Sequence, residues 1–432
     1  MEGVRLGEIA EVLGAKLRGD PDSVPTGASV DSRTIRKGEI FFALRGERTD
    51  GHKFVGDALR KGASAAVVRR KWMEENPDVE PLLGVDDPLK ALGKLGAWYR
   101  RRFKVEVVAV TGSSGKTTVK EMTAAVLGTS YNVLKSEGSW NNEIGLPLTL
   151  LMLSGGHDLA VVELGMNAPG EIRRLAEMAR PCVGTITNVG PAHIGAFGSL
   201  EGVARAKGEL LEVLEGKAVL HWDDPWVRRL GEGADLRAEE VRLEEGRPSF
   251  VVEGVRVKLE VLGRYQVYNA LASLAIGISF GISLSQGAKA LEKFRPPPLR
   301  CEVKDFGGIK VLLDCYNANP TSVKEALKLL SSLPGRRIAV LGDMLELGDE
   351  ARRFHREVGA YAARCGIDLL LCTGRWAEDM AAGAGEGRAE VLDREGLVRR
   401  LRELTRPGDK VLVKASRRVA LEEVVERAFG EI

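Results

Sequence analysis

The chain has 432 residues, of which 44% are hydrophobic and 29% are charged, and its formal net charge is +2. This composition predicts a folded globular protein of about three domains and excludes a largely disordered chain. The near-neutral charge gives no electrostatic reason to expect nucleic acid or an anionic membrane surface as a partner.

The cysteines and the apolar segments favour a cytoplasmic protein. Five cysteines, at 182, 301, 315, 365 and 372, form no pair with metal-ligand spacing, as in a reducing compartment. The N-terminus lacks the basic start and apolar core of a signal peptide. The most apolar stretch, residues 270–284, is shorter than the ~18 residues needed to span a bilayer, so we expect a buried helix there.

Residues 1–102 predict a small α/β domain. Helical and strand-like segments alternate here, at 5–15, 39–44, 52–62 and 64–70. A longer helical pattern over 87–103 closes the domain, with Asp87 as its N-cap and Pro88 in its first turn.

Residues 103–298 predict a central domain around a parallel sheet. Apolar runs alternate with helical stretches, which is typical of βαβ units. The runs lie at 105–110, 158–164, 183–189 and 217–222. The pattern continues to about residue 293, and the three prolines at 296–298 cannot continue a helix. We therefore place a domain boundary there.

Residues 299–432 alternate in the same way and predict a Rossmann-like domain. Its apolar runs lie at 309–314, 337–343, 368–374 and 409–416. No G-x-G-x-x-G follows the first run, so we expect no dinucleotide. The fold prediction for the whole chain is α/β, with a small N-terminal domain, a P-loop-type parallel-sheet ATPase domain and a C-terminal Rossmann-like domain.

The segment "VTGSSGKTTVKEM" (110–122) predicts a phosphate-binding loop. Its spacing is shorter than the usual P-loop, which would need glycine where the chain has Val110. Gly112 and Gly115 let the backbone approach an anion, and the first helical turn offers its N–H groups. Lys116 adds a cation, and the Thr117 hydroxyl is a ligand for Mg²⁺. The alternative is an ordinary glycine-rich turn.

Three polar residues follow predicted strands and indicate a metal site. Glu163 ends one strand, His193 follows another, and Lys207 lies in the next helical segment. Ligands collect at the carboxyl ends of strands in such sheets, and a carboxylate suits a hard cation. Taken alone, His193 is explained as a loop or capping residue, and Lys207 as a solvated lysine.

Several motifs in the same order resemble the Mur ligase family of peptidoglycan synthesis, and within it the branch that adds D-alanyl-D-alanine. The shortened loop "TGSSGKTT" is typical of this family. The other matching segments are residues 31–54, 139–151, 161–172, 188–210, 312–323, 340–348 and 411–417. The "DNPR" tetrapeptide of the diaminopimelate-adding branch is missing.

The resemblance implies an ATP-dependent amide ligase. A peptide carboxylate of UDP-N-acetylmuramoyl-tripeptide attacks the γ-phosphate of ATP, giving an acyl phosphate and ADP. The amine of D-Ala-D-Ala then displaces phosphate. The third residue of the acceptor peptide, diaminopimelate or lysine, stays open. Related ligases generally act as monomers.

The resemblance also implies roles for individual residues. The implied catalytic residues are Lys116, His193, Lys207 and Arg300. Two Mg²⁺ ions are held by Thr117, Glu163, His193 and a Lys207 carbamylated by CO₂. The nucleotide lies against Gly112, Ser113, Ser114, Gly115, Lys116, Thr117, Thr118, Asn269, Arg300 and Asp314. The other substrates contact Asp31, Ser32, Arg33, Asn141, Asn142, Asn317, Asn319, Lys414 and Ser416.

Two positions depart from the family pattern. Gln266 stands where asparagine is usual, and Ala415 replaces a usual glycine, which puts their contacts with ligands in doubt. Two alternative functions stay open. One is another amide ligase of the superfamily with a different amine substrate, and the other is a P-loop regulatory or motor ATPase that forms no covalent product.

Overall fold

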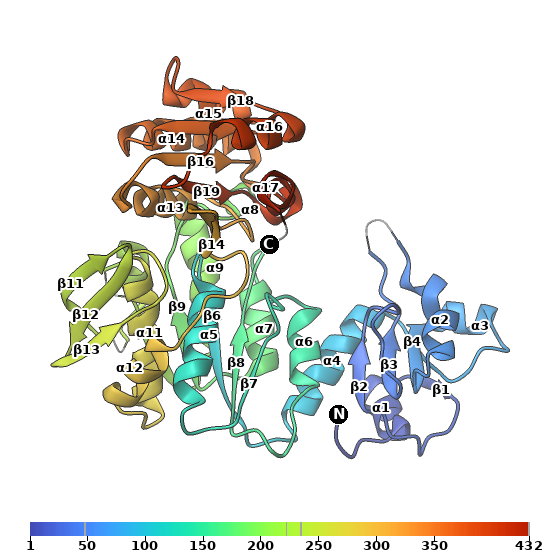
Figure 1. The fold of residues 1–432 in the computed structure, drawn as a ribbon. Helices are drawn as coiled ribbons and strands as arrows, with labels where there is room; N and C mark the ends of the chain where they lie inside the picture. Colours follow the sequence, from blue (N-terminus) through green and yellow to red (C-terminus); the bar gives the residue numbers. More distant parts are fainter. Residues whose placement is uncertain (47–48, 222, 234–235, 431–432) are drawn as a thin grey trace.

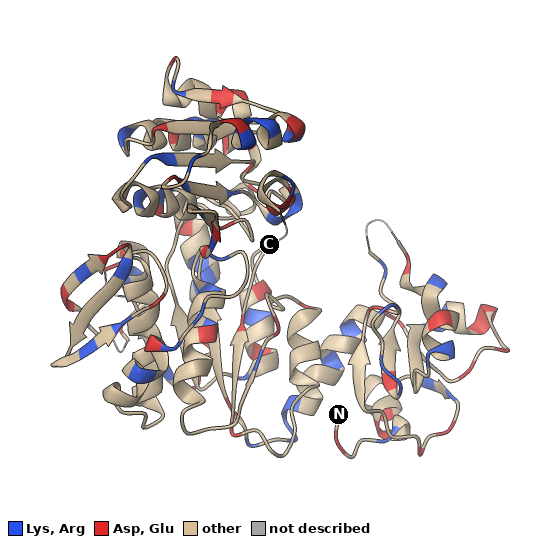
Figure 2. Ribbon diagram, in the orientation of Figure 1, with Lys and Arg blue, Asp and Glu red and all other residues tan. Residues whose placement is uncertain are grey.

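The computed structural model describes residues 1–46, 49–221, 223–233 and 236–430. It contains three α/β regions, each built around its own sheet (Figure 1), so the prediction of a three-domain α/β protein is confirmed. The boundaries at 102 and 298 stay predictions. Glu47 and Arg48, which belong to the matching segment 31–54, lie outside the described residues. Basic and acidic residues are interspersed in all three regions (Figure 2).

The first region is a five-stranded sheet in the order β1-β5-β4-β3-β2. Strands β2 to β5 are parallel, and β1 pairs antiparallel with β5. The strands are β1 (Lys16–Arg18), β2 (Gly27–Ser29), β3 (Glu39–Phe42), β4 (Ala65–Arg69) and β5 (Leu82–Val85). The helices are α1 (Leu6–Leu13), η1 (Gly51–Phe54), α2 (Val55–Arg60) and α3 (Arg70–Glu75).

Helix α4 (Pro88–Arg100) joins the first region to the central one. It packs against α1 and strands of the first sheet on one side and against α6 and α7 of the central region on the other. The Tyr99 hydroxyl donates to the Leu153 carbonyl (3.0 Å), and Arg100 Nε donates to the Ala179 carbonyl (3.0 Å). One continuous apolar cluster therefore spans both regions.

The central sheet has the order β10-β9-β6-β8-β7, and all its strands are parallel. The strands are β6 (Glu106–Thr111), β7 (Val133–Lys135), β8 (Leu159–Glu163), β9 (Val183–Ile186) and β10 (Lys217–Leu220). The helices are α5 (Lys116–Leu127), α6 (Gly145–Leu150), α7 (Glu171–Ala179), α8 (Ile194–Phe197), α9 (Leu200–Val213), α10 (Pro225–Leu230), α11 (Gln266–Ser279) and α12 (Leu284–Glu292). Because β6 lies between β8 and β9, the loop that follows β6 opens at the switch point where such sheets bind ligands.

The apolar stretch at 270–284 is largely the buried helix α11, as expected. None of the helices in the described part of the chain is long and apolar enough to cross a membrane.

The prediction of βαβ units up to residue 293 is wrong in one place. A three-stranded antiparallel sheet, β11 (Glu239–Glu244), β12 (Arg247–Val252) and β13 (Val255–Lys258), lies between β10 and α11. It is the yellow-green sheet beside α11 in Figure 1. The exposed β11 consists mostly of charged residues, so it has no apolar alternation to read. The available signal was the two Glu-Gly pairs at 245–246 and 253–254, since two-residue loops ending in glycine join hairpins.

The third region is a six-stranded sheet in the order β14-β15-β19-β16-β17-β18. Its edge strand β14 is antiparallel and the others are parallel. The strands are β14 (Glu302–Phe306), β15 (Ile309–Leu313), β16 (Arg337–Leu341), β17 (Leu369–Cys372), β18 (Ala389–Val391) and β19 (Lys410–Lys414). The helices are α13 (Pro320–Ser332), η2 (Gly348–Glu350), α14 (Ala351–Arg364), α15 (Ala377–Ala384), α16 (Arg394–Leu404), η3 (Arg417–Val419) and α17 (Glu422–Phe429). Two apolar clusters fill it, and it stands over the strand ends of the central sheet (Figure 1).

Candidate active site

The predicted phosphate loop lies between β6 and α5, as expected. Gly115 is the N-cap of α5 with φ of 82°, and no side chain caps this helix end, so its first N–H groups are available to an anion. Lys116 folds back over the loop and donates to the Gly112 carbonyl (2.9 Å). Burial lowers the pKa of the Lys116 ammonium, against the opposing effect of Glu163.

Glu163 sits at the end of β8 and is 1% exposed. One carboxylate oxygen accepts from Thr117 Oγ1 (2.6 Å) and the other from Asn141 Nδ2 (2.8 Å). Both partners are neutral, so the charge of this buried carboxylate is not balanced by either of them. A buried carboxylate flanked by a hydroxyl and an amide is a donor set that suits a hard cation, and it fits the predicted role of Thr117 and Glu163.

His193 and Lys207 reach the site from two consecutive helices. His193 is the N-cap of α8, and its Nδ1 lies 2.9 Å from Glu346 Oε2 of the third region. Lys207 on α9 is 2% exposed, so it is not the solvated lysine of the alternative interpretation. Among the described residues it forms no ion pair with a carboxylate. Burial, with the nearby Lys116 charge, holds the pKa of Lys207 well below its ordinary value.

No group of three His, Cys, Asp or Glu side chains that could hold a metal exists among residues 1–46, 49–221, 223–233 and 236–430. The predicted ligand set includes only two such residues, together with a hydroxyl and a modified lysine. An unmodified Lys207 ammonium would repel a cation here, whereas the predicted carbamate would offer it an oxygen ligand.

Arg300 lies between the central and third regions. Its guanidinium stacks on the Tyr316 ring, 4.1 Å from the centroid, and Nη2 donates to Ser139 Oγ (3.3 Å). Ser139 also donates to the Tyr316 hydroxyl. Ser139 belongs to the loop that carries Asn141, so this contact joins the arginine to the loop that bonds Glu163.

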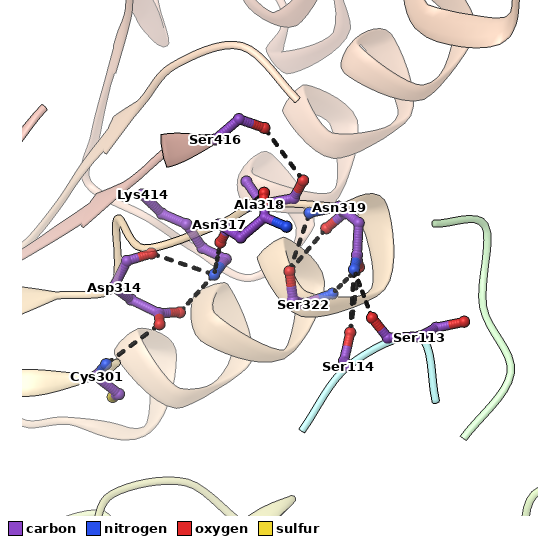
Figure 3. A network of polar contacts seen from close by, with 10 residues as sticks. All are labelled: Ser113, Ser114, Cys301, Asp314, Asn317, Ala318, Asn319, Ser322, Lys414 and Ser416. Carbon is purple, nitrogen blue, oxygen red and sulfur yellow. Dashed lines mark hydrogen bonds and ion pairs between the residues drawn. The ribbon is translucent and has the colours of Figure 1, made fainter. Parts of the chain in front are cut away.

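Asp314 and Lys414 form an ion pair at the ends of β15 and β19, with Oδ2 and Nζ 2.6 Å apart (Figure 3). Lys414 also donates to the Asn317 carbonyl (3.1 Å), and Asp314 accepts from the Cys301 main-chain N–H (3.2 Å). The pair therefore ties the chain just after Arg300 to the end of the central strand of the third sheet.

Asn319 caps α13 and contacts the phosphate loop at the same time (Figure 3). Its Oδ1 accepts from Ser322 N (2.9 Å), while Nδ2 donates to Ser114 Oγ (3.1 Å) and to the Ser113 carbonyl (3.4 Å). The N-terminus of α13 is thereby fixed over the loop.

These residues surround one cavity of about 650 Å³ between the central and third regions. Of the predicted site residues, it is lined by Ser113, Ser114, Gly115, Lys116, Thr117, Thr118, Asn141, Asn142, Glu163, His193, Lys207, Asn269, Arg300, Asp314, Asn317, Asn319 and Lys414. Gly112 belongs to the phosphate loop but does not line the cavity. Ser416 supports the wall, since its Oγ accepts from the Leu345 main-chain N–H (2.9 Å).

Asp31, Ser32 and Arg33 do not line this cavity. They follow β2 in the first region, where Arg33 and Asp31 form an ion pair with 2.7 Å between Nη2 and Oδ2. Hydrogen bonds from Arg33 hold the pKa of Asp31 at about 2. The Ser32 carbonyl accepts from Lys61 Nζ (2.7 Å).

The two departures from the family pattern have different surroundings. Gln266 lines the cavity and accepts a hydrogen bond from Asn269 Nδ2 (2.8 Å), so its amide orients Asn269. Ala415 is buried in the apolar core of the third region, against Gly342, and does not line the cavity.

Sequence reasoning missed Ser139, Tyr316 and Glu346 as parts of this site. All three lie within segments that carry the family resemblance. Each of these side chains makes its contact across the junction between the central and third regions. Their part in the site therefore depends on how the two regions pack, which the sequence pattern does not reveal.

Family models match most of the chain. "Mur ligase family, catalytic domain" matches residues 26–100, "Mur ligase middle domain" matches 110–277, and "Mur ligase, glutamate ligase domain" matches 299–417.

Curated proteins and solved structures are similar to this chain over nearly its whole length. The UDP-N-acetylmuramoyl-tripeptide--D-alanyl-D-alanine ligase of Escherichia coli is 37% identical and covers 100% of this chain and 99% of its own. Crystal structure I of MurF from Acinetobacter baumannii is 30% identical, with a TM-score of 0.90 and 99% of each chain covered. MurF ligase from Thermotoga maritima in complex with ADP is 31% identical, with a TM-score of 0.82 over 93% of this chain and 96% of its own.

Proposed function

Because the chain belongs to the Mur ligase family, we propose that it is the ATP-dependent ligase that joins D-alanyl-D-alanine to UDP-N-acetylmuramoyl-tripeptide. The products are the UDP-muramyl-pentapeptide, ADP and phosphate. The observation that carries the proposal is the cavity in which the phosphate loop, Glu163 and the third region face one another, in a chain that is similar to such ligases from end to end.

The reaction has two steps. A carboxylate of the tripeptide attacks the γ-phosphorus, the bond to the β-phosphate oxygen breaks, and an acyl phosphate and ADP result. The dipeptide amine then attacks the acyl carbon, phosphate leaves, and the amine loses its proton as the peptide bond forms. Water must be excluded between the steps, because it would hydrolyse the acyl phosphate. The third region, seated over the cavity, supplies that exclusion.

The phosphate loop holds the triphosphate. Main-chain N–H groups at Gly115 and in the first turn of α5 bind the phosphate oxygens, and the Lys116 ammonium contacts the β- and γ-phosphates. A helix end alone stabilises a negative charge by at most ~2 kcal/mol, so the lysine is needed as well. Ser113, Ser114 and Thr118 complete the wall of the loop.

Two Mg²⁺ ions belong to the proposal, the first held by Thr117 and the second by Glu163, His193 and a carbamylated Lys207. Bound Mg²⁺ neutralises charge that develops on the transferred phosphoryl group. Lys207 is suited to carbamylation, because its lowered pKa leaves more of the neutral amine that reacts with CO₂. The carbamate then exchanges a repelling cation for an oxygen anion.

The third region contributes the groups that close the site. We assign Arg300 to the γ-phosphate, where its guanidinium stabilises the transferred charge, and Asp314 to the ribose. Asn269, on α11 of the central region, is assigned to the adenine. Lys414, Ser416, Asn317 and Asn319 face the acceptor peptide or support residues that do. Asp314 pairs with Lys414 in the structure, so a ribose that binds at Asp314 would share or replace that partner.

The remaining substrate contacts lie further from the phosphate loop. We place uridine diphosphate at Asp31, Ser32 and Arg33, and the muramyl peptide at Asn141 and Asn142. Residues 1–102 then bind the nucleotide-sugar, 103–298 bind ATP, and 299–432 complete the ligase site. We further propose that the enzyme acts in the cytoplasm as a monomer, with these small molecules as its only partners.

Product mass spectrometry tests the proposal directly. The enzyme receives ATP, Mg²⁺, D-Ala-D-Ala and UDP-muramyl-tripeptide with either diaminopimelate or lysine at position three. We expect a product heavier by one dipeptide less water, formed with one phosphate released. A product only with diaminopimelate, lysine or glutamate as the amine would favour another ligase of the superfamily. ATP hydrolysis with no peptide dependence would favour the motor or regulatory ATPase.

A further inference from the structure

The contact between His193 and Glu346 joins two residues that both have a left-handed backbone. His193 has φ of 58° and Glu346 has φ of 67°, in a region that residues other than glycine seldom occupy. Their Nδ1 and Oε2 atoms lie 2.9 Å apart. Such conformations persist only where the surroundings impose them, and they cluster at functional sites. Two of them facing each other across a cavity wall call for a functional explanation.

The segments that carry the two residues are packed backbone against backbone. A Cβ on Gly195 would lie 2.9 Å from the main-chain nitrogen of Gly348, and a Cβ on Gly348 would lie 3.0 Å from the Cα of Gly195. Between them, Ile194 packs on an apolar cluster of the third region. The two side chains therefore meet because their backbones are docked, not because two long side chains happened to extend toward each other.

The segment before Glu346 is anchored from within the third region. The Met344 main-chain N–H donates to His355 Nε2 (2.9 Å), and the Leu345 N–H donates to Ser416 Oγ (2.9 Å). His355 is fully buried. Glu346 is consequently presented at the junction from a fixed backbone.

The chemistry of imidazole gives this contact a consequence. In a neutral histidine one ring nitrogen carries the proton, and the other can accept a hydrogen bond or bind a metal. A carboxylate beside Nδ1 favours the proton on that atom. Histidines that bind metals generally donate their second N–H to a carboxylate or carbonyl, which fixes the tautomer and the ring orientation.

We propose that Glu346 is a positioning residue for the metal site: its carboxylate accepts the Nδ1 proton of His193 and leaves Nε2 as the nitrogen that binds a divalent cation. The inference rests on the proposed function, which assigns His193 to the cation. Because Glu346 comes from the third region and His193 from the central one, docking of the third region completes the metal site. Closure and metal binding are then one coupled event.

The competing explanation is an ordinary surface ion pair. The Glu346 side chain is 57% exposed, and ion pairs between exposed side chains contribute little to stability. Such a pair would leave the tautomer of His193 and the metal affinity unchanged when it is removed. The two explanations therefore differ in measurable ways.

The first experiment reads the tautomer without metal or substrate. ¹⁵N-labelled wild type, Glu346→Ala and Glu346→Gln are compared by histidine ring NMR, with His193→Asn to assign the resonance among the five histidines. We expect the Nδ1–H form in wild type and a shift toward Nε2–H in Glu346→Ala. Glu350→Gln, in the same segment and paired with Arg353, is the matched control and should match wild type. Identical ring shifts in wild type and Glu346→Ala would overturn the proposal.

The second experiment measures Mn²⁺ affinity by electron paramagnetic resonance in the presence of ADP. We expect Glu346→Ala to bind Mn²⁺ about 10- to 100-fold more weakly, and Glu350→Gln to bind as wild type does, with circular dichroism confirming that each variant is folded. If His193→Asn bound Mn²⁺ as tightly as wild type does, His193 would not be a metal ligand. The metal assignment of the proposed function would then fail, and this inference with it. If wild type held such an ion and Glu346→Ala held it equally well, the inference alone would fail.

Discussion

The Lys120 ammonium donates a hydrogen bond to the Ser136 main-chain carbonyl, with 2.5 Å between Nζ and O, although Lys120 is completely buried in α5. It also donates to the Gly138 carbonyl (2.7 Å) and lies 3.0 Å from Glu121 Oε1. The helix that begins at the phosphate loop is thereby tied to the segment that carries Asn141.

We predict that Lys120→Met destabilises the protein by about 2–4 kcal/mol, because it leaves the buried Ser136 carbonyl and the more exposed Gly138 carbonyl without their donor. It also loosens the segment that presents Asn141, so KM for the UDP-muramyl-tripeptide should rise. Chemical denaturation and steady-state kinetics check both effects. Lys135→Met is the matched control, since Lys135 pairs with the same Glu121 at the surface and its loss should change stability by less than about 1 kcal/mol. Equal effects of the two variants would contradict the buried anchor.

Arg300→Ala should lower kcat by about 10²- to 10³-fold, as does loss of a group that stabilises charge in the transition state. Its stacking on Tyr316 is worth about 0.5–1 kcal/mol, so the variant should stay folded. Phosphate release at saturating ATP and thermal denaturation measure the two effects. The control is Arg295→Ala, which removes an exposed arginine on the other side of the three prolines at 296–298. Turnover within a few-fold of wild type in Arg300→Ala would refute the assignment.

Lys207→Met should abolish ligation yet raise the free energy of unfolding in CO₂-free buffer by about 1–4 kcal/mol. The substitution replaces a buried amine, which forms no ion pair with any residue that the structure describes, with an apolar side chain of similar length. The folded pKa of Lys207 is lowered, so the unfolded chain binds more protons between that value and 10.5. Wild-type stability therefore rises with pH across this window, and the variant should lack that rise. Lys94→Met, at an exposed position of α4, is the control. A less stable Lys207→Met would show that the amine is paired.

His355 predicts a loss of stability in mild acid. Its buried Nε2 accepts from Met344 and its Nδ1 donates to the Ala351 carbonyl (2.6 Å). Burial lowers its pKa, against Asp343 and Asp379, from the ordinary 6.5. Below that value the unfolded chain takes up a proton that the folded protein refuses, so the free energy of unfolding falls as pH falls.

His355→Gln should flatten this dependence between pH 7.5 and 5.5, as measured by urea denaturation at each pH. The matched control is His157→Gln, which alters a histidine in a turn of the central region and should keep the wild-type slope. Equal slopes in all three proteins would exclude His355 as the cause.

Local sequence patterns predicted the helices, strands and loops that are specified by residues close together in the chain. Asp87 accepts from the Leu89 and Lys90 N–H groups, as an N-cap at that position should. The glycine loop and α5, and the strand ending at Glu163, also formed where the sequence placed them. In each case apolar periodicity and a capping or turn residue lie within a few positions of one another.

The remaining features depend on residues distant in the chain. Glu346 gains meaning only from His193, 153 positions earlier, and Arg300 only from Ser139 and Tyr316. Helix α4 looked like the end of the first domain, and no local pattern reveals that its other face packs on the central region. Tertiary packing, which single-sequence patterns do not encode, decides these relationships.

The apolar cluster that α4 shares with both neighbours holds the first two regions at a fixed separation. With uridine diphosphate bound at Asp31, Ser32 and Arg33, as proposed above, and the reacting carboxylate required at the phosphate loop, a rigid core would set the distance between them. A muramyl peptide one residue too short would not reach the phosphoryl group, and one too long would overshoot it. Selection by chain length would then precede any recognition of the side chain at the peptide's end.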